Sequence, residues 1–439
     1  MLAYTALVSV AFSVLALFVR PGMGLGLVVA ATLVWPEYLR ISMGVAEMSA
    51  PRLVALTLFI RYFINGRALS TRFLPVDYLV LASWFWGIFA AAMAGGEPTP
   101  LRMVGAGLDT VLIYFVARWS IGNAQDLKAM TLPLLLTAFF MCAMGVLEST
   151  TYYSPYQALE QFRSWEGIGQ TYEFRLGFLR AKASTSVSIF FGMAMMLVAA
   201  MLWSVRDVVR SRFLALAGVA ASFVAAFTSL SSGPWIGCAT LIFFNSFYKR
   251  TSLIKPALWA LACFALLIEI ASDRHFYHMI NYLGLSGGTA WYRTRLLEVM
   301  LNHLNEYWLF GMGGKSTDHW IAEIGGQASL DIVNHFLVLA FFSGLMAMFL
   351  YLAAQVFAIR LAVKAFRSTS HTKSRKLIFG FAAGLVALNV TSLSVGLFGP
   401  PLILSNILLG ASVTVFAIFV KAGQHETATT KAATRPQSG

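Results

Sequence analysis

The sequence predicts an all-α fold, a polytopic membrane protein built as one helical bundle. Of its 439 residues, 58% are hydrophobic and only 12% are charged, whereas soluble proteins average about 25% charged residues. The apolar residues gather in runs of about 15 to 20, the length that a helix needs to cross about 30 Å of hydrocarbon. Alternating ten-residue strands of the kind that form membrane barrels are not found. Composition therefore excludes a water-soluble fold.

About thirteen apolar segments are predicted to span the membrane as helices. Six form an N-terminal part, residues 1–147, and cover residues 3–19, 23–36, 51–64, 75–94, 103–118 and 127–147. Four form a central part, residues 184–271, and cover residues 184–203, 213–230, 235–248 and 253–271. Three form a C-terminal part, residues 331–420, and cover residues 332–359, 377–395 and 402–420. The second and third segments are short, so twelve spans are equally tenable.

Basic residues in short loops set the expected orientation, because Lys and Arg are retained on the cytoplasmic side. The loop near residue 370 carries six basic residues and no acid: Arg360, Lys364, Arg367, Lys373, Arg375 and Lys376. Every second loop before it is also basic. The long acidic loops, residues 148–183 and 272–330, are then periplasmic, and the protein belongs to a bacterial inner membrane. Unusually long loops commonly carry function. The tail, residues 421–439, is expected to be disordered and cytoplasmic.

Charge and cysteine usage exclude several other classes of protein. The net charge of +13 follows the loop pattern of a membrane protein, so nucleic acid is not expected as a partner. Cys142, Cys238 and Cys263 lie in apolar stretches without a CxxC pair, so no zinc site or disulfide framework is indicated. The string GGKS at 313–316 lacks the first glycine of a P-loop, since position 309 is Leu. No cofactor or metal is expected.

Four segments carry a family resemblance through their order and spacing. An amphipathic helix opened by Arg293 runs to Trp308 and a G-x-G turn, Gly311 and Gly313, within TAWYRTRLLEVMLNHLNEYWLFGMGG at 289–314. The segment DIVNHFLVLAFFSGLMAMFLYL at 331–352 places Asn334 ten residues before Gly344. Upstream lie EFRLGFLRAKAS at 173–184 and TSLSSGPWIG at 228–237. In this pattern the chain resembles the O-antigen ligase and polymerase family of membrane glycosyltransferases.

The resemblance implies a glycosyltransferase of the GT-C type with a large periplasmic loop, which transfers glycan from an undecaprenyl-diphosphate-linked oligosaccharide to a sugar hydroxyl. Many ligases place His before the Asn of the re-entering helix, where this chain has Val333, and the Ser-rich turn often holds Arg where this chain has Ser232. The first difference favours a polymerase of exopolysaccharide or O-antigen repeats over a ligase acting on lipid A core. A transporter or flippase is the alternative from another class. Expected partners are the lipid bilayer, a flippase and chain-length or export proteins.

Arginine suits a diphosphate leaving group, because its planar fork binds two oxygens and stays charged. Arg175 and Arg293 are the first candidates for catalysis, and Arg180, Lys182 and Arg295 are expected to bind substrate, with Arg274 as a further outer cation. Snorkelling to lipid headgroups is the alternative role for each. Because no outer loop shows clustered carboxylates, the reaction is expected to be metal-independent.

The remaining candidates flank the re-entering helix and the amphipathic helix. His335 has the side-chain chemistry of a general base, although a structural role is the alternative. Asp331 either binds substrate or caps the helix, and Asn334 is expected at the substrate. Trp291 and its aromatic neighbours either stack on sugar rings or form an interfacial belt. Glu298 and Glu323 are further possible bases.

Overall fold

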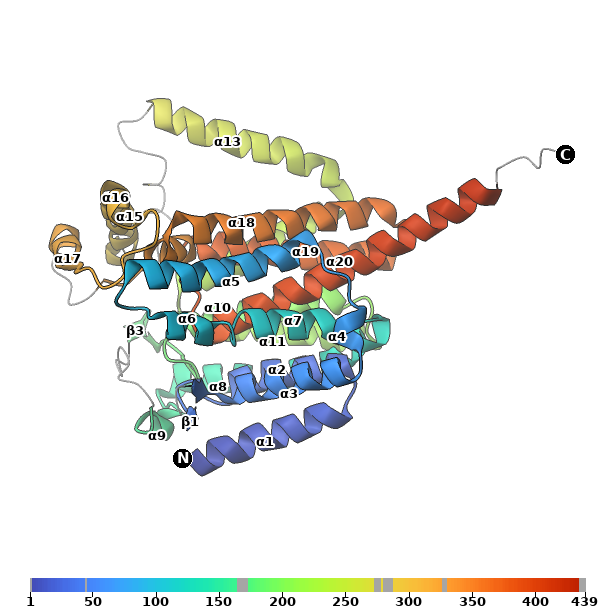
Figure 1. Ribbon diagram of the computed structural model, residues 1–439, viewed down its shortest axis with the longest axis horizontal. Coiled ribbons are helices and arrows are strands. Elements are labelled where there is room, and N and C mark those ends of the chain that lie inside the picture. Colours follow the sequence, from blue (N-terminus) through green and yellow to red (C-terminus); the bar gives the residue numbers. More distant parts are fainter. Residues whose placement is uncertain are drawn as a thin grey trace.

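A computed structural model describes residues 2–43, 46–163, 173–271, 278, 287–325 and 330–433. The described chain is mostly helical, and its long helices run side by side in one bundle (Figure 1). The N-terminal half contains α1 Leu2–Phe18, α2 Pro21–Val34, α3 Ala50–Ile64, α4 Arg67–Ser70, α5 Pro75–Ala94, α6 Pro100–Ala106, α7 Val111–Ser120, α8 Ala124–Thr151 and α9 Gln157–Glu160.

The C-terminal half contains α10 Ser188–Val205, α11 Arg212–Thr228, α12 Ser232–Ser246, the 3-10 helix η1 Phe247–Leu253, α13 Ile254–Ala271, α15 Gly287–Asn302, α16 Leu304–Tyr307, α17 Asp318–Ile324, α18 His335–Ser368, α19 Thr372–Ser392 and α20 Pro400–Ala433. Two small antiparallel hairpins complete the described chain, β1 Ile41–Met43 with β2 Ala46–Met48, and β3 Phe174–Arg175 with β4 Phe178–Leu179. Helices therefore form at every apolar run of the sequence.

Seven helical stretches of the described chain are long and apolar enough to cross a membrane by themselves: Pro75–Ala94, Pro100–Ser120, Ala124–Thr151, Ser188–Val205, Ser232–Ala271, His335–Ser368 and Pro400–Gln424. This number is smaller than the expected twelve or thirteen, in part because some helices are short and two are counted together. Helices α1, α2 and α11 are apolar but shorter. One stretch of 40 residues contains both α12 and α13, which meet across η1. The architecture is that of an all-α, multi-pass membrane protein.

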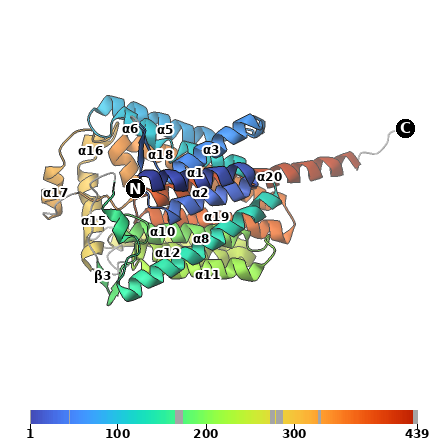
Figure 2. The same ribbon diagram turned by 90° about the horizontal axis from the view of Figure 1, so that it is seen from below.

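The two long loops meet at one end of the bundle. Figures 1 and 2 place α15, α16, α17 and β3 beyond the ends of the long helices, and Figure 1 places α9 there as well. The opposite end holds α4 and the C-terminal part of α20. The described parts of residues 148–183 and 272–330 therefore face the same side, and the short basic connection at α4 lies on the other. We name α15, α16 and α17, with their connections from residue 287 to residue 325, the cap.

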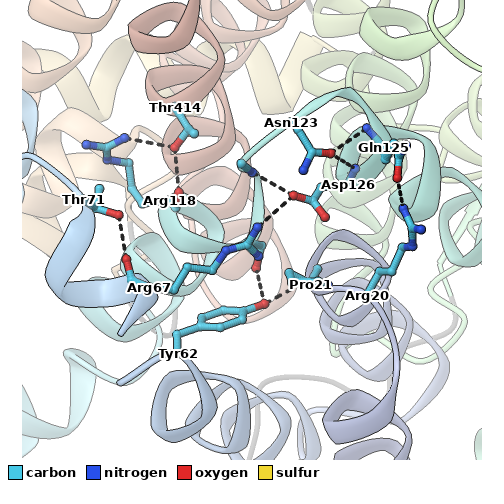
Figure 3. A network of polar contacts seen from close by, with 12 residues as sticks. Arg20, Pro21, Tyr62, Arg67, Thr71, Arg118, Asn123, Gln125, Asp126 and Thr414 are labelled. Carbon is cyan, nitrogen blue, oxygen red and sulfur yellow. Dashed lines mark hydrogen bonds and ion pairs between the residues drawn. The ribbon is translucent and has the colours of Figure 1, made fainter. Parts of the chain in front are cut away.

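A buried ion pair fastens three helices near the basic end. The Arg118 guanidinium donates to both carboxylate oxygens of Asp77, with Nε to Oδ1 at 2.8 Å and Nη2 to Oδ2 at 2.9 Å. Its Nη1 donates to Thr414 Oγ1 at 3.0 Å (Figure 3). The charged side chains are 3% and 1% exposed. Arg118 thus lies buried in α7 and joins α5 to α20.

The polar network drawn in Figure 3 continues from this pair along the basic end. Arg67 at the start of α4 contacts Asp126 of α8, with 3.0 Å between Nη2 and Oδ2. The Tyr62 hydroxyl lies 2.9 Å from Ser120 Oγ. These contacts connect helices that are far apart in the sequence, because buried polar groups need partners.

A break in α18 attaches the cap to the bundle. Ser343 and Gly344 leave helical geometry, with φ of 76° at Gly344. The released backbone groups bond to the cap, from Met312 N to Phe341 O and from Leu345 N to Trp308 O, both at 2.8 Å. A Cβ at position 344 would lie 2.0 Å from a backbone oxygen of the cap. The position therefore requires glycine, and Gly311 and Gly313 of the cap also lie close to backbone atoms of other segments.

Helix α20 continues to Ala433 and so includes part of the tail, whose expected disorder over residues 421–439 stays a prediction. The residues after position 423 are mainly Ala, Thr, Glu and Lys, and no Pro occurs before position 436. Ala, Lys and Glu are good helix formers, so the membrane helix can extend past its apolar part. The last residues, 434–439, lie outside the described residues.

Candidate functional site: an arginine cluster at a serine-rich turn

The turn between α11 and α12 forms the base of the candidate site. Residues 229–231 separate the two helices, and Leu230 adopts a left-handed conformation with φ of 47°. A non-glycine residue in this region is strained by about 1–2 kcal/mol, and such strain commonly marks functional positions. The carbonyl groups of Ser229 and Leu230 lie outside helical pairing and accept hydrogen bonds from two arginine side chains.

The β3–β4 hairpin delivers the first two arginines to this turn. Its two central residues, Leu176 and Gly177, both have positive φ, of 56° and 80°, as a two-residue I′ turn requires. Arg175 Nη1 donates to Leu230 O at 2.9 Å. Arg180 donates through Nη2 to Ser231 Oγ at 2.8 Å and through Nε to Ser229 O at 3.3 Å, and it also pairs with Glu173.

Helix α15 of the cap delivers the third arginine. Arg293 is 9% exposed, and its Nη1 donates to Ser232 Oγ at 3.2 Å. Its Nε is buried and has no hydrogen-bond partner in the described chain. We call Arg175, Arg180 and Arg293 the arginine cluster. All three contact the turn within residues 229–232, although they come from two long loops that are far apart in the sequence.

The cluster concentrates positive charge with little compensation. Burial lowers the pKa of Arg293, and the neighbouring Arg175 lowers this pKa further, while Asp331 raises it. Burial also lowers the pKa of Arg175. The charge of Arg180 lowers this pKa further, and the charge of Glu173 raises it. Partly buried like charges are unfavourable unless an anion binds between them. Guanidinium forks are well suited to the oxygens of a phosphate or diphosphate.

Lys182 has a different environment from the three arginines. Its Nζ lies 2.5 Å from Glu160 Oε1, and the residue is 5% exposed. The backbone N–H groups of Lys182 and Ala183 donate to Glu148 Oε2 at 3.2 and 2.7 Å. Nearby, the Arg163 guanidinium lies 4.8 Å from the centre of the Tyr38 ring. The ammonium thus belongs to a buried polar cluster that holds the first loop, and the expected role of Lys182 in substrate binding stays a prediction.

Arg295 and Trp291 lie on the cap, outside the arginine cluster. Arg295 Nη1 pairs with Glu298 Oε2 at 2.9 Å, and its Nε and Nη2 both donate to Glu323 O at 3.2 Å. Arg295 therefore fastens α15 to α17. Trp291 is 52% exposed, whereas Tyr292 is buried and its hydroxyl donates to Asp331 O at 2.9 Å. Of these aromatic residues, Trp291 retains a surface for stacking.

The start of α18 shows which residue caps the helix. Asn334 Oδ1 accepts from the N–H groups of Phe336 at 2.9 Å and Leu337 at 3.3 Å. Asn334 is therefore the N-cap, a role that the sequence analysis considered for Asp331. Desolvation raises the pKa of the Asp331 carboxyl, and the positive charge of Arg293 lowers it. Asp331 thus lies within electrostatic reach of the cluster.

His335 is buried rather than open to an acceptor. It is 3% exposed, its Nδ1 accepts from the Leu397 N–H at 3.3 Å, and its ring packs edge-on against Tyr351 at 5.1 Å. These contacts agree with the structural role that the sequence analysis gave as the alternative to a catalytic base. Arg274 lies outside the described residues.

The sequence showed no sign of the carboxylates that hold the first loop, Glu148 and Glu160. Outer acids served there as markers of orientation, and no local pattern identifies their partners. No protein-family model matches the chain, and no curated protein matches it at a significant level.

Proposed function

We propose that the protein is a polymerase of undecaprenyl-diphosphate-linked oligosaccharide repeats, in an inner membrane with the cap facing the periplasm. The observation that carries this proposal is the convergence of Arg175, Arg180 and Arg293 on one turn, at the end of the bundle where both long loops meet. The basic loop near residue 370 supports the orientation. The family resemblance supports the glycan chemistry.

The proposed reaction follows from the charges of the cluster. The hydroxyl oxygen of one repeat attacks the anomeric carbon of another, a new glycosidic bond forms, and the bond to the diphosphate breaks. The hydroxyl proton passes to a base, and undecaprenyl diphosphate leaves with the bonding electron pair. Arg293 and Arg175 stabilise the charge that develops on the leaving group. We assign the role of base to Asp331, because its carboxyl interacts electrostatically with Arg293 and a carboxylate can accept the proton.

The lipid part of the donor requires an apolar approach to this site. Helix α13 stands apart from the bundle and has no buried residue (Figure 1). A cavity of about 490 Å³ lies between α12 and α13, lined by apolar side chains that include Phe243, Phe247, Leu258 and Phe264. The apolar lining suits a polyprenyl chain. The cavity lies at the end of α12 opposite Ser232, the residue that contacts Arg293, so a chain bound there would extend along α12 toward the arginine cluster.

Reconstitution tests the proposal against its alternatives. Purified protein in lipid vesicles receives a synthetic undecaprenyl-diphosphate oligosaccharide, and the products are separated by size. A polymerase gives a ladder of repeats and one released undecaprenyl diphosphate for each new linkage. Transfer that occurs only with lipid A core as acceptor indicates a ligase instead. Movement of intact donor across the bilayer without a new bond indicates a flippase, and either result would reject a polymerase.

A further inference from the structure

The cap contains a second cluster of polar side chains, separate from the arginine cluster. His303, Glu306 and His319 place one ligand atom each within 4.8 Å of one another. His303 Nδ1 lies 2.5 Å from Glu306 Oε1, and His319 Nε2 lies 3.2 Å from both oxygens of the same carboxylate. His303 precedes α16, Glu306 belongs to α16, and His319 belongs to α17. Two imidazoles therefore converge on one carboxylate from two helices.

The other ring nitrogen of His303 also has an acidic partner. Its Nε2 lies 2.8 Å from Glu323 Oε1. A neutral imidazole carries one N–H, so it can donate to only one of two carboxylates. The second nitrogen then needs either a proton or a metal ion between itself and its neighbour. Imidazoles that bind metal commonly donate their remaining N–H to a carboxylate, which orients the ring. Glu323 occupies this position relative to His303.

The surrounding cap fixes the orientation of the two imidazole rings. The His303 ring stacks on Trp320 with centroids 5.5 Å apart and an angle of 28° between planes. Trp320 is fully buried in the cap, so this ring has a defined orientation. His319 packs edge-on against His303 at 5.1 Å. The His319 side chain is 48% exposed, which leaves a path from solvent.

We propose that His303 Nδ1, His319 Nε2 and a Glu306 oxygen bind one Zn²⁺ ion, with Glu323 as hydrogen-bond acceptor for His303 and water as the fourth ligand. Two His and one carboxylate form a donor set that zinc favours, whereas Mg²⁺ and Ca²⁺ favour oxygen ligands. Ligands of a tetrahedral ion at about 2.1 Å lie about 3.4 Å apart. The 3.2 Å contact fits this value, and the 2.5 Å contact opens by about 1 Å when the ion enters.

The ion has a structural consequence for the cap. It joins the start of α16 to α17 across the connection that contains Lys315, whose Nζ donates to the carbonyl of Glu306 at 2.6 Å. The four zinc-site residues make none of the contacts described for the arginine cluster. The zinc is therefore a clip within the cap, and it does not depend on the identity of the transferred glycan.

Metal binding to the purified full-length protein tests the proposal without an activity assay. The affinity tag must contain no histidine, and the protein is first freed of metal by dialysis. Titration with Co²⁺, a coloured substitute for zinc, should saturate at one equivalent with the visible absorption of a four-coordinate ion, and Zn²⁺ should displace it. Binding should also release protons where the ligands are protonated.

Matched variants distinguish a built site from surface binding. His303→Ala and His319→Ala should weaken binding by at least about a hundredfold, and Glu323→Gln should weaken it about ten- to hundredfold because it changes only the orienting partner. His371→Ala, an exposed histidine at the start of α19, should bind as the unmodified protein does. Circular dichroism and size-exclusion profiles identify any misfolded variant, and Glu323→Gln gives the least disruptive comparison. Failure to bind at micromolar Zn²⁺, or equal binding by all variants, would overturn the proposal.

Discussion

Replacement of Arg293 by Lys is the most direct perturbation of the arginine cluster. The substitution keeps one positive charge but removes the planar fork. Among the described residues Arg293 has a hydrogen bond to Ser232, and its buried Nε has no partner there. That unused donor is available to a bound diphosphate. Loss of the Ser232 contact alone should lower the free energy of unfolding by about 1 kcal/mol, which is too little to prevent folding.

The expected loss of activity is larger than this loss of stability. Removal of one donor to developing negative charge costs about 2.7–4 kcal/mol of transition-state stabilisation. Since about 1.4 kcal/mol corresponds to a tenfold change in rate, Arg293→Lys should slow transfer about a hundredfold or more. Arg175→Lys should show a similar loss, because Arg175 contacts the same turn. A residue that only snorkels to headgroups would tolerate Lys.

Initial rates of undecaprenyl diphosphate release from vesicles measure this effect. Arg295→Lys is the matched control, because it lies two residues away on α15 and its contacts are to Glu298 and Glu323 in the cap. We expect the rate of this variant to lie within about threefold of that of the unmodified protein. The substitution weakens only partly exposed ion-pair and hydrogen-bond contacts, which contribute about 1 kcal/mol or less. Near-normal rates for both Arg293→Lys and Arg175→Lys would refute the diphosphate role.

Four further predictions concern the fold, its orientation and its chemistry. Gly344→Ala should destabilise the protein by about 3 kcal/mol or more, measured as a lower thermal midpoint, because a glycine-only conformation and a 2.0 Å approach coincide there. Arg118→Ala should lower the free energy of unfolding by about 3–5 kcal/mol, because it leaves the buried Asp77 carboxylate without its cation. The double variant Arg118→Met with Asp77→Leu should recover much of that stability. Equal thermal midpoints for the single and double variants would contradict this. In a cysteine-free variant, a cysteine at Ser316 should react with an impermeant maleimide in intact cells, and one at Ser370 only after lysis; the reverse pattern would invert the orientation. Transfer should need neither Mg²⁺ nor Mn²⁺, so a rate increase on adding either ion to the zinc-loaded protein would contradict direct reaction at the arginines.

The helices were predictable because one physical requirement dominates each of them. A segment in hydrocarbon must satisfy its backbone groups internally, so every apolar run had to be helical regardless of its neighbours. The prediction over 75–94 and the observed α5, Pro75–Ala94, agree in both bounds. The spans at the basic end were harder, because Arg118 resembles a loop cation until Asp77 is found beside it.

The candidate site was predictable in its residue types and less so in their roles. Arg180 and Lys182 are two positions apart, yet one reaches the turn at Ser231 and the other pairs with Glu160. That difference depends on a carboxylate elsewhere in the chain, which a local pattern does not reveal. The sequence offered Asp331 as the cap of this helix, whereas Asn334 is the residue that caps α18.

The residues of the proposed zinc site have a recognisable spacing in the sequence. His303 and Glu306 are three residues apart, and His319 and Glu323 are four apart; residues at these spacings are neighbours on a helix. A search for clustered carboxylates missed this pattern, because two of the four groups are imidazoles. Neither pair alone indicates a metal site. The packing of α16 against α17 brings the ligand atoms of His303, Glu306 and His319 within 4.8 Å of one another.

Ser232 accepts a hydrogen bond from Arg293, so the positive charge at this turn comes from another part of the chain. The family that the chain resembles often holds Arg in this turn, whereas here the Ser232 hydroxyl accepts from Arg293 at 3.2 Å. An arginine at 232 would bring a further guanidinium against one whose pKa burial and Arg175 already lower, so the two side chains would repel each other. We infer that this chain keeps the cation at the turn but supplies it from α15 of the cap. Because Arg293 belongs to the cap, the complete arginine cluster requires the cap to pack against the turn. Under the proposed function, binding of the leaving group would then depend on this packing.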